Sequence, residues 1–372
     1  MTDVLVSGAS VAGITAAYWF ARHGYSVIVV ERHPGLRPGG QAVDVRGPVL
    51  TVLERMMLRA AADHVRTRMR GASVVDRDGN ELSQDTESTP TGGPIAGPDI
   101  ELLRDDLVEL LYDSTKLNCE FVFDDTIVAL DDDGAAVGVT FEHADARSFD
   151  LVIGADGLHS HVRRLVFGPE EQFVERLGTF AAIFTVPNFL DLDYRQIWHY
   201  GDSTMAGVYS ARNNSEARAM IGFMDPDLRI DPRDTEAHFA ELEKRMADDG
   251  WVRPQLLQYM RTAPDFYFDE MSQIKMDRWS KGRVALVGDA GYCCSPLSGQ
   301  GTSVALLGGY ILAGELKAAG DDYELGFANY QNEFQDYVKR NQWLVVDNIP
   351  GGAPIPQEVF ERIVGSLTLK DY

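Results

Sequence analysis

The chain has 372 residues, of which 45% are hydrophobic and 24% charged, and its formal net charge is -23 at pH 7. One hydrophobic core rarely grows beyond about 250–300 residues, so this length predicts a globular protein of about two domains. The excess of carboxylates argues against nucleic acid and anionic membrane surfaces as partners. Three cysteines provide no disulfide framework, and no basic, apolar leader opens the chain. We therefore expect a cytoplasmic protein without membrane insertion.

The first thirty residues have the pattern of a strand, a turn, a helix and a second strand. Val4–Val6 predicts a short buried strand, and Ile14–His23 predicts a helix that Gly24 ends. Val27–Val30 is a β-branched run that predicts the second strand. This βαβ pattern is typical of a parallel sheet, in which ligands bind beyond the carboxyl ends of the strands.

The turn of this unit, GASVAG, differs by one residue from the dinucleotide fingerprint G-x-G-x-x-G. Gly8 permits the tight turn, and Gly13 lets the helix approach the strand, so that the helix N-terminus faces a pyrophosphate. Ser10 occupies the middle position, where its hydroxyl can donate to a phosphate oxygen. Glu31, at the end of the second strand, can accept hydrogen bonds from a ribose. A nucleophile elbow at Ser10 is the disfavoured alternative, because its fifth residue would be glycine and is Ala12.

The middle of the chain alternates between helical and strand patterns. We predict a helix over Pro48–Ala62, a hairpin around Asp78–Gly79, and an amphipathic helix through 100–111. Residues 126–153 alternate like a β-meander that ends in the sequence GADG. Residues 173–269 are strand-rich and aromatic, and are interrupted by one amphipathic helix, Thr235–Asp248.

Two further motifs follow buried strands. The first is IGADGLHSHVRR, in which Asp156 follows an apolar strand. The second is RVALVGDAGYCCSPLSGQGTSVALL, in which Asp289 lies at a strand end, where a carboxylate can hold a polyol hydroxyl. Its turn PLSGQG leads into a helix over Gly301–Leu316, whose positive N-terminus favours an anionic group.

These three motifs, in this order, resemble the FAD-dependent monooxygenases of the para-hydroxybenzoate hydroxylase type, the group A aromatic hydroxylases. The resemblance covers roughly residues 1–345, and it is nearest to the tetracycline-inactivating and polyketide-tailoring hydroxylases. It implies an α/β fold with a Rossmann-like FAD-binding domain and a second α+β substrate domain, whose mixed sheet covers the flavin. We expect the FAD domain at 1–72, 97–172 and 270–345, the substrate domain at 73–96 and 173–269, and a C-terminal helical segment at 346–372.

The resemblance also implies a role for individual residues in binding FAD. Arg46, Pro296 and Gly299 are expected to form the flavin environment of catalysis, without a general base. Tyr292 and Ser303 stand where the family has histidine and asparagine. The full set of expected cofactor contacts is Gly8, Ser10, Gly13, Glu31, Arg32, Arg46, Arg104, Asp156, Asp289, Pro296, Gly299, Gln300, Gly301 and Thr302.

The implied reaction uses NADPH or NADH as a transient reductant and O₂, and hydroxylates a phenolic or polycyclic small molecule through a flavin C4a-hydroperoxide. The protein would supply orientation and a dry cavity. Baeyer–Villiger insertion, epoxidation, dehydrogenation, and a cyclase or carrier without redox turnover remain alternatives. We expect a monomer or homodimer without a metal, and Gln196 and Arg212 as possible polar anchors. The expected substrate-pocket residues are Phe180, Phe184, Trp198, Tyr200, Tyr209, Phe223 and Met224.

Overall fold

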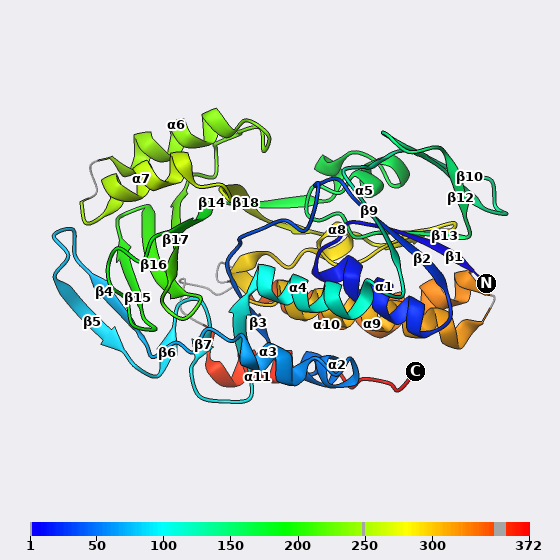
Figure 1. Cartoon of the computed structure of the whole chain (residues 1–372), viewed down its shortest axis with the longest axis horizontal. Coiled ribbons are helices and arrows are strands. Elements are labelled where there is room, and N and C mark those ends of the chain that lie inside the picture. The colour runs from blue at the N-terminus through cyan, green and yellow to red at the C-terminus, as the bar shows by residue number, and fades with distance from the viewer. Residues whose placement is uncertain (1, 248–249, 321, 346–354) are drawn as a thin grey trace.

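The computed structural model describes residues 2–247, 250–320, 322–345 and 355–372. Two domains lie side by side in Figure 1, one built on a mostly parallel sheet and the other on a mostly antiparallel sheet. The strands of each sheet come from distant parts of the sequence, so the chain crosses between the domains several times. Among the described residues, no helix is long and apolar enough to cross a membrane.

Six strands form the central sheet of the first domain. Their apolar runs are buried, as is typical of parallel strands that are covered on both faces. Only the edge strand β19 joins antiparallel. The spatial order is β19 (Ser280–Lys281), β20 (Val284–Leu286), β13 (Leu151–Gly154), β1 (Asp3–Ser7), β2 (Ser26–Glu31) and β9 (Glu120–Phe123).

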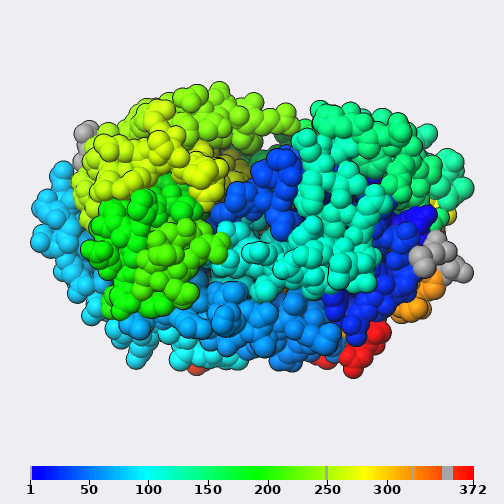
Figure 2. All heavy atoms as spheres, viewed as in Figure 1, coloured from blue at the N-terminus to red at the C-terminus, as the bar shows by residue number. Residues whose placement is uncertain are grey.

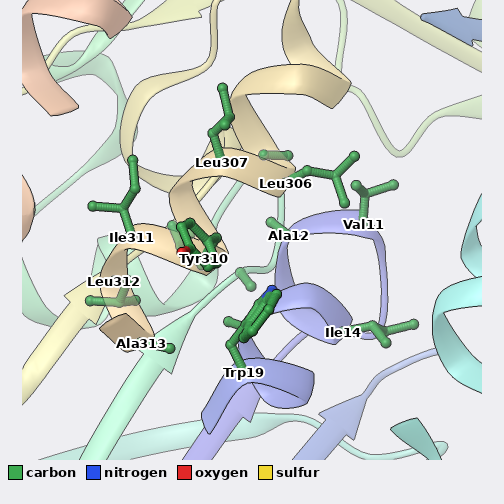
Figure 3. Close-up of a cluster of buried hydrophobic side chains, with 14 of the residues drawn as sticks. Val11, Ala12, Ile14, Trp19, Leu306, Leu307, Tyr310, Ile311, Leu312 and Ala313 are labelled. Atoms are coloured by element: carbon green, nitrogen blue, oxygen red, sulfur yellow. The ribbon is translucent and has the colours of Figure 1, made fainter. Parts of the chain in front are cut away.

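Helices pack on one face of this sheet and form the largest core of the molecule. Trp19 and Tyr310, on two of these helices, meet edge to face with ring centroids 4.8 Å apart (Figure 3). Gly309 permits their close approach, because a Cβ there would lie 2.9 Å from the backbone nitrogen of Ala16. The helices are α1 (Val11–Arg22), α4 (Arg104–Thr115), α9 (Gly301–Ala319) and α10 (Tyr323–Trp343).

A small antiparallel sheet covers the other face of the central sheet. Val137, Val139 and Phe149 from this small sheet pack against Leu5 and Val152 of the central sheet. Its strands are β10 (Ile127–Asp132), β11 (Val137–Phe141) and β12 (Arg147–Phe149), and α5 (His161–Val166) lies beside them.

The second domain is a seven-stranded sheet with two helices on one face. All its strand pairs are antiparallel except β15 with β4. The strand order is β18 (Tyr267–Ile274), β14 (Val174–Val186), β17 (Glu216–Met224), β16 (Thr204–Ala211), β15 (Gln196–Tyr200), β4 (Ala72–Val75) and β5 (Glu81–Asp85). The two helices are α6 (Thr235–Met246) and α7 (Arg253–Thr262).

A two-stranded ribbon joins the two domains. Ala42 and Leu103 of this ribbon pack against Trp198 and Tyr209 of the second sheet. The ribbon consists of β3 (Ala42–Val45) and β8 (Ile100–Leu103), and β6 (Ser88–Thr89) and β7 (Gly93–Pro94) form a smaller pair. The remaining elements are α2 (Val49–Arg55), α3 (Arg59–His64), α8 (Asp289–Tyr292), α11 (Gln357–Val364) and the short 3₁₀ helices at Glu170–Gln172 and Pro296–Ser298.

The C-terminal residues are fastened to α9. A Cβ at Gly314 would lie 2.1 Å from the ring of Tyr372. The absence of a side chain at Gly314 therefore allows this ring to pack directly against α9. The hydroxyl of Tyr372 and the ammonium of Lys370 both donate to the buried carboxylate of Glu315, at 2.7 Å each. The expected helical segment at 346–372 contains α11, and its residues 346–354 lie outside the described residues.

Most predicted elements agree with the structure, but two helices do not. The helix predicted through 100–111 begins only at Arg104, because Ile100–Leu103 form strand β8, which pairs with β3. The hairpin around Asp78–Gly79 is confirmed by the pairing of β4 with β5. The helix predicted over Pro48–Ala62 is wrong, because α2 ends at Arg55 and α3 begins only at Arg59. Met57 interrupts it with φ +60°, a left-handed conformation that ends helices. The helix predicted over Thr235–Asp248 ends at Met246, and Asp248 lies outside the described residues.

Helix α9 gives a direct test of this packing. Leu312 is completely buried, so Leu312→Ala should lower the free energy of unfolding by about 2–5 kcal/mol, because it removes packed atoms and leaves a cavity. Leu117 is 89% exposed, so Leu117→Ala should change it by less than about 0.5 kcal/mol. Urea denaturation of both variants measures the difference. Equal effects would contradict the position of α9 in the core.

Candidate functional site

The glycine turn after β1 is fixed by close backbone contacts. Gly8 has φ +109°, and a Cβ there would lie 2.5 Å from the carbonyl oxygen of Ala155. A Cβ at Gly13 would lie 1.9 Å from the carbonyl oxygen of Gly8. Ser10 occupies the N-cap position of α1 in an extended conformation, and its side chain makes no capping hydrogen bond. The turn therefore presents the helix N-terminus and a free hydroxyl toward the carboxyl edge of the sheet.

Glu31 lies beside this turn, at the end of β2. One carboxylate oxygen accepts a hydrogen bond from the backbone N–H of Ala9 at 2.8 Å, and the other accepts from that of His33 at 2.9 Å. Arg32 next to it is exposed. These contacts orient the carboxylate of Glu31 at the end of the second strand.

The D-G motif forms the neighbouring turn, after β13. Asp156 accepts hydrogen bonds from the backbone N–H groups of His161 and Val162, at 2.8 and 3.0 Å, and from the hydroxyl of Ser160. The carboxylate thus caps α5, while Ala155 packs against Gly8 of the first turn. Two of the three sequence motifs meet at this point.

Asp289 begins the third motif, directly after β20. It follows Gly288, which has φ +66°. The side chain is exposed to solvent, yet it lies deep among protein atoms, and this desolvation raises the pKa of its carboxyl above the usual range. An accessible carboxylate near the end of this strand can hold a hydroxyl group of a ligand.

The Pro296–Thr302 turn leads from α8 into α9. Pro296 and Gly299 are exposed, and Gly299 adopts the left-handed conformation with φ +64°. A Cβ at Gly299 or Gly301 would meet no protein atom within 4 Å. Gln300 is completely buried, and its Oε1 has no hydrogen-bond partner. Open space around the glycines and an unpaired buried oxygen mark this turn as a place where another molecule belongs.

Arg104 and Arg46 are buried on the other side of the cleft, near the β3–β8 ribbon. Arg104 donates to the carbonyl oxygens of Arg37 and Gly39, at 2.9 and 2.7 Å. Its burial lowers its pKa to about 10. Arg46 contacts the carboxylate of Asp44 at 2.9 Å and the carbonyl oxygen of Gly92. In both arginines the Nε atom has no hydrogen-bond partner.

Asp44 is a part of the site that sequence reasoning missed. Its burial raises the pKa of its carboxyl to about 7, although the nearby Arg46 opposes the shift. Ser303 accepts a hydrogen bond from the backbone N–H of Arg46 and donates to the carbonyl oxygen of Asp44, both at 3.3 Å. The segment VDVRG places Asp44 two residues before Arg46, and this spacing on a strand was the available signal.

A buried polar network behind Arg46 was also missed. Gln196 donates to the hydroxyl of Thr91 and accepts from the indole N–H of Trp198 at 3.0 Å. Thr91 and Thr67 both donate to the carboxylate of Glu101. Gln196 is thus fully buried and paired within the protein, so the structure does not place it as an exposed anchor for a ligand.

His159 connects the D-G turn to the second domain. Its Nδ1 lies 2.9 Å from Glu170 and its Nε2 lies 3.3 Å from Asp269 on β18. Burial by itself would lower the pKa of His159. The hydrogen bonds to Asp269 and Glu170 outweigh this effect and raise the pKa to about 9. Both ring nitrogens therefore carry protons at neutral pH and donate to the two carboxylates. Within the described ranges, no cluster of three or more His, Cys, Asp or Glu side chains could hold a metal ion.

Three of the expected pocket residues lie on the opposite face of the second sheet. Phe180, Phe184 and Phe223 belong to the core beneath α6 and α7. The structure corrects the prediction for these three, because side chains alternate between the faces of a strand, and aromatic content alone does not reveal which face is which. The pairing of Phe180 with Phe223 places both on the same face, with their rings stacked at 5.1 Å.

The other four expected residues divide into buried and exposed pairs. Trp198 and Tyr209 lie on the face toward the first domain, but both are packed, and the hydroxyl of Tyr209 accepts a hydrogen bond from the backbone N–H of Ala42 at 3.0 Å. Tyr200 and Met224 are 51% and 55% exposed. Tyr200 and Met224 are therefore the accessible members of the expected pocket set. Arg212, an expected polar anchor, is paired with the carboxylates of Asp105 and Asp106 in α4.

The comparisons with known proteins agree with this geometry. Residues 1–339 match the family model described as FAD binding domain. The chain belongs to the FAD-dependent monooxygenase family. It is 38% identical over 339 residues to a flavin-dependent monooxygenase of Legionella longbeachae, covering 91% of this chain and 86% of that protein. An uncharacterized protein of Mycobacterium tuberculosis is 79% identical over the full length of both chains.

The solved structures of tetracycline destructases are similar to this FAD-dependent monooxygenase along its whole length. Tet(51) has 34% identity and a TM-score of 0.90, and 100% of each chain is covered. Tet(55) has 33% identity and a TM-score of 0.88, covering 100% of this chain and 99% of that one. The protein therefore has the α/β fold of flavoprotein hydroxylases, as the sequence predicted.

The residues of the cleft fit FAD. Buried polar atoms without a partner occur at Arg46, Arg104 and Gln300, which are all expected cofactor contacts. The glycine turn and the exposed carboxylate of Asp289 suit a pyrophosphate and a polyol. Tyr292, where the family has histidine, is 2% exposed and accepts a hydrogen bond from the hydroxyl of Tyr330 at 2.8 Å, so it lies in the helical core.

Gly301 provides a test of FAD binding at this turn. A side chain there meets no protein atom, so Gly301→Val should leave the melting temperature of the apoprotein unchanged. FAD affinity should fall by about tenfold or more, because the side chain enters the space of the cofactor. Gly138→Val in β11 is the matched control, since its Cβ also makes only ordinary contacts. Titration of the apoproteins with FAD measures both, and unchanged FAD affinity of Gly301→Val would place the flavin elsewhere.

The His159 bridge predicts a dependence of stability on pH. The pKa of His159 is about 9 in the folded chain and about 6.5 in the unfolded chain. The bridge therefore contributes its full stabilisation below about pH 6.5, and this contribution is lost as the pH rises through about 9. Because His159 is partly exposed, we expect a contribution of about 1 kcal/mol. His159→Gln should remove this part of the pH dependence of unfolding, and exposed His64→Gln should not. An unchanged profile for His159→Gln would refute the bridge.

Proposed function

We propose that this protein uses FAD, NADPH or NADH, and O₂ to hydroxylate a planar phenolic or polycyclic small molecule of the polyketide or tetracycline type. One oxygen atom of O₂ enters the substrate and the other leaves as water, while the reductant supplies two electrons. The likeness to tetracycline destructases over the whole chain carries the proposal of this substrate class. Free thiols at all three cysteines are compatible with a reducing cytoplasm.

The chain's own residues would bind and orient FAD across the cleft. The turn after β1 would receive the pyrophosphate, Glu31 and Arg32 the adenosine, and Asp289 the ribitol. Arg104 would approach from the far side, where its Nε has no partner. We propose Asp156 beside both FAD and the reductant, with its carboxylate tied to α5.

The flavin ring would lie against the Pro296–Thr302 turn. Bound flavin supplies the activation of O₂ and the transfer of one oxygen atom. The N-terminus of α9 provides a positive electrostatic potential at this turn, which favours negative charge on a bound group. Arg46 and Ser303 hold β3 against the start of α9, so the wall of the cavity is rigid there. None of these residues needs to act as a general base.

The substrate would enter between this turn and the accessible side chains of the second sheet. Tyr200 and Met224 are large and 51% and 55% exposed, so both side chains are accessible to a substrate. Met205 and Met220 are only partly buried beside the packed ring of Trp198. A flexible thioether and an aromatic platform suit a flat, largely apolar molecule.

The product mass tests this function. Purified protein with FAD, NADPH and air would be incubated with tetracyclines, anthraquinones and simple phenols, and each product compared with a sample without NADPH. We expect a gain of one oxygen atom that requires the reductant, with the highest yield on a polycyclic phenol. Tyr200→Ala should raise KM more than it lowers kcat, because it removes binding area rather than flavin contacts.

Other outcomes would contradict the proposal. An isomer of unchanged mass would indicate a cyclase on the same flavin scaffold. A product that has lost two hydrogens would indicate dehydrogenation. An ester, which has the same mass as the hydroxylated product and is distinguished from it by its NMR spectrum, would indicate Baeyer–Villiger chemistry. Oxidation of NADH in preference to NADPH would change only the identity of the reductant.

A further inference from the structure

The segment between β2 and β3 is held from both domains. From the first domain, Arg104 donates to the carbonyl oxygens of Arg37 and Gly39, and Asp105 accepts from the backbone N–H of Gly39 at 3.1 Å. From the second domain, Arg218 donates to the carbonyl oxygen of Gly40 at 3.3 Å. Figure 2 shows this blue segment in the hollow between the two domains. It therefore crosses the cleft beside the proposed contact of Arg104 with FAD.

An ion-pair cluster ties the two domains together at the same place. Arg212, in the turn between β16 and β17, lies 2.7 Å from Asp105 and 2.6 Å from Asp106 at the start of α4. The two bonds use different nitrogens, Nη2 to Asp105 and Nη1 to Asp106, so the guanidinium spans both carboxylates. Arg212 also contacts Glu216 at 3.0 Å, and Arg218 lies 3.8 Å from Asp105.

Three consecutive residues of this turn, beginning with Arg212, adopt the left-handed backbone conformation. Arg212, Asn213 and Asn214 have φ angles of 47, 55 and 68°, and asparagine tolerates this left-handed region better than arginine does. Asn214 is pinned in place, because its side chain accepts from the backbone N–H of Tyr194 and donates to Asp193, both at 2.9 Å. Strain of this kind persists only where the surroundings fix it, and it is often associated with function.

The cluster also controls the charge next to the cofactor. Asp105 and Asp106 directly follow Arg104, so two carboxylates lie beside a residue that is proposed to meet the FAD phosphates. In a chain with a net charge of -23, they would repel a diphosphate if they were unpaired. Arg212, which comes from the other domain, offsets part of this negative charge, and Arg218 lies 3.8 Å from Asp105.

We propose that Arg212, Asp105 and Asp106 form an interdomain clasp that holds the segment Arg37–Gln41 closed beside the FAD phosphates and so limits the rate of FAD release. Opening the cleft to release FAD requires these ion pairs to break. The clasp residues position the segment and the charge around Arg104, and do not take part in the chemistry. This inference rests on the proposed placement of FAD at Arg104.

The experiment measures FAD release from the holoprotein. Dilution into buffer with a trap for free FAD would be followed by the rise of flavin fluorescence, at about 50 mM and about 500 mM NaCl. Arg212→Gln should release FAD about tenfold faster at low salt, and its rate should depend less on salt than that of the wild type. Arg261→Gln is the matched control, because Arg261 is similarly exposed and binds Glu243 within the second domain. It should release FAD at the wild-type rate.

A charge swap separates the clasp from a general loss of stability. Arg212→Glu should release FAD quickly, and the double variant Arg212→Glu with Asp106→Arg should restore slow release, because the pair is reformed in reverse. Failure of the swap to restore release, or equal acceleration by Arg261→Gln, would overturn the clasp. If the wild type holds FAD but Arg212→Gln releases it no faster, only the clasp fails. A wild type that binds no FAD would refute the proposed function itself.

Discussion

The parallel pairing of β2, β1, β13 and β20 is the constraint on which the candidate site depends. Because these four strands run in one direction, their carboxyl ends meet at one edge of the sheet. The glycine turn, Glu31, the D-G turn and Asp289 all follow directly from those strand ends. The contact of Gly8 with the backbone of Ala155 then sets the distance between the first two motifs. Motifs more than a hundred residues apart thereby become neighbours.

The interface between the two domains is polar where it borders the cleft. The ion pairs of Arg212 with α4 and the bridge of His159 to Asp269 join segments that are distant in sequence. Such groups stabilise a fold weakly when they are exposed, but buried ones fix geometry because an unpaired charge is costly there. These polar contacts supplement the apolar packing of Ala42 and Leu103 against Trp198 and Tyr209, which also joins the second sheet to the first domain.

The departures from the family pattern have local structural explanations. Ser10 is the N-cap of α1, and its side chain makes no capping hydrogen bond at the glycine turn after β1. Tyr292 reaches into the helical core, where Gly308 leaves room for its hydroxyl: a Cβ there would lie 2.0 Å from that oxygen. Ser303 joins α9 to β3 through two hydrogen bonds of 3.3 Å. None of the three removes a glycine that shapes the Pro296–Thr302 turn.

The amino-acid sequence by itself determined the βαβ opening, the strand–turn motifs and the family, because glycines at fixed spacings and apolar runs have few structural solutions. It did not determine which face of the second sheet points to the cleft, since Phe180 and Phe184 alternate as regularly as Trp198 and Tyr200 do. Nor did it indicate that Arg212 meets Asp105, or that Gln196 is buried and bonded to Thr91. Those contacts join residues that are far apart along the chain, and only tertiary packing decides which polar groups lose water together.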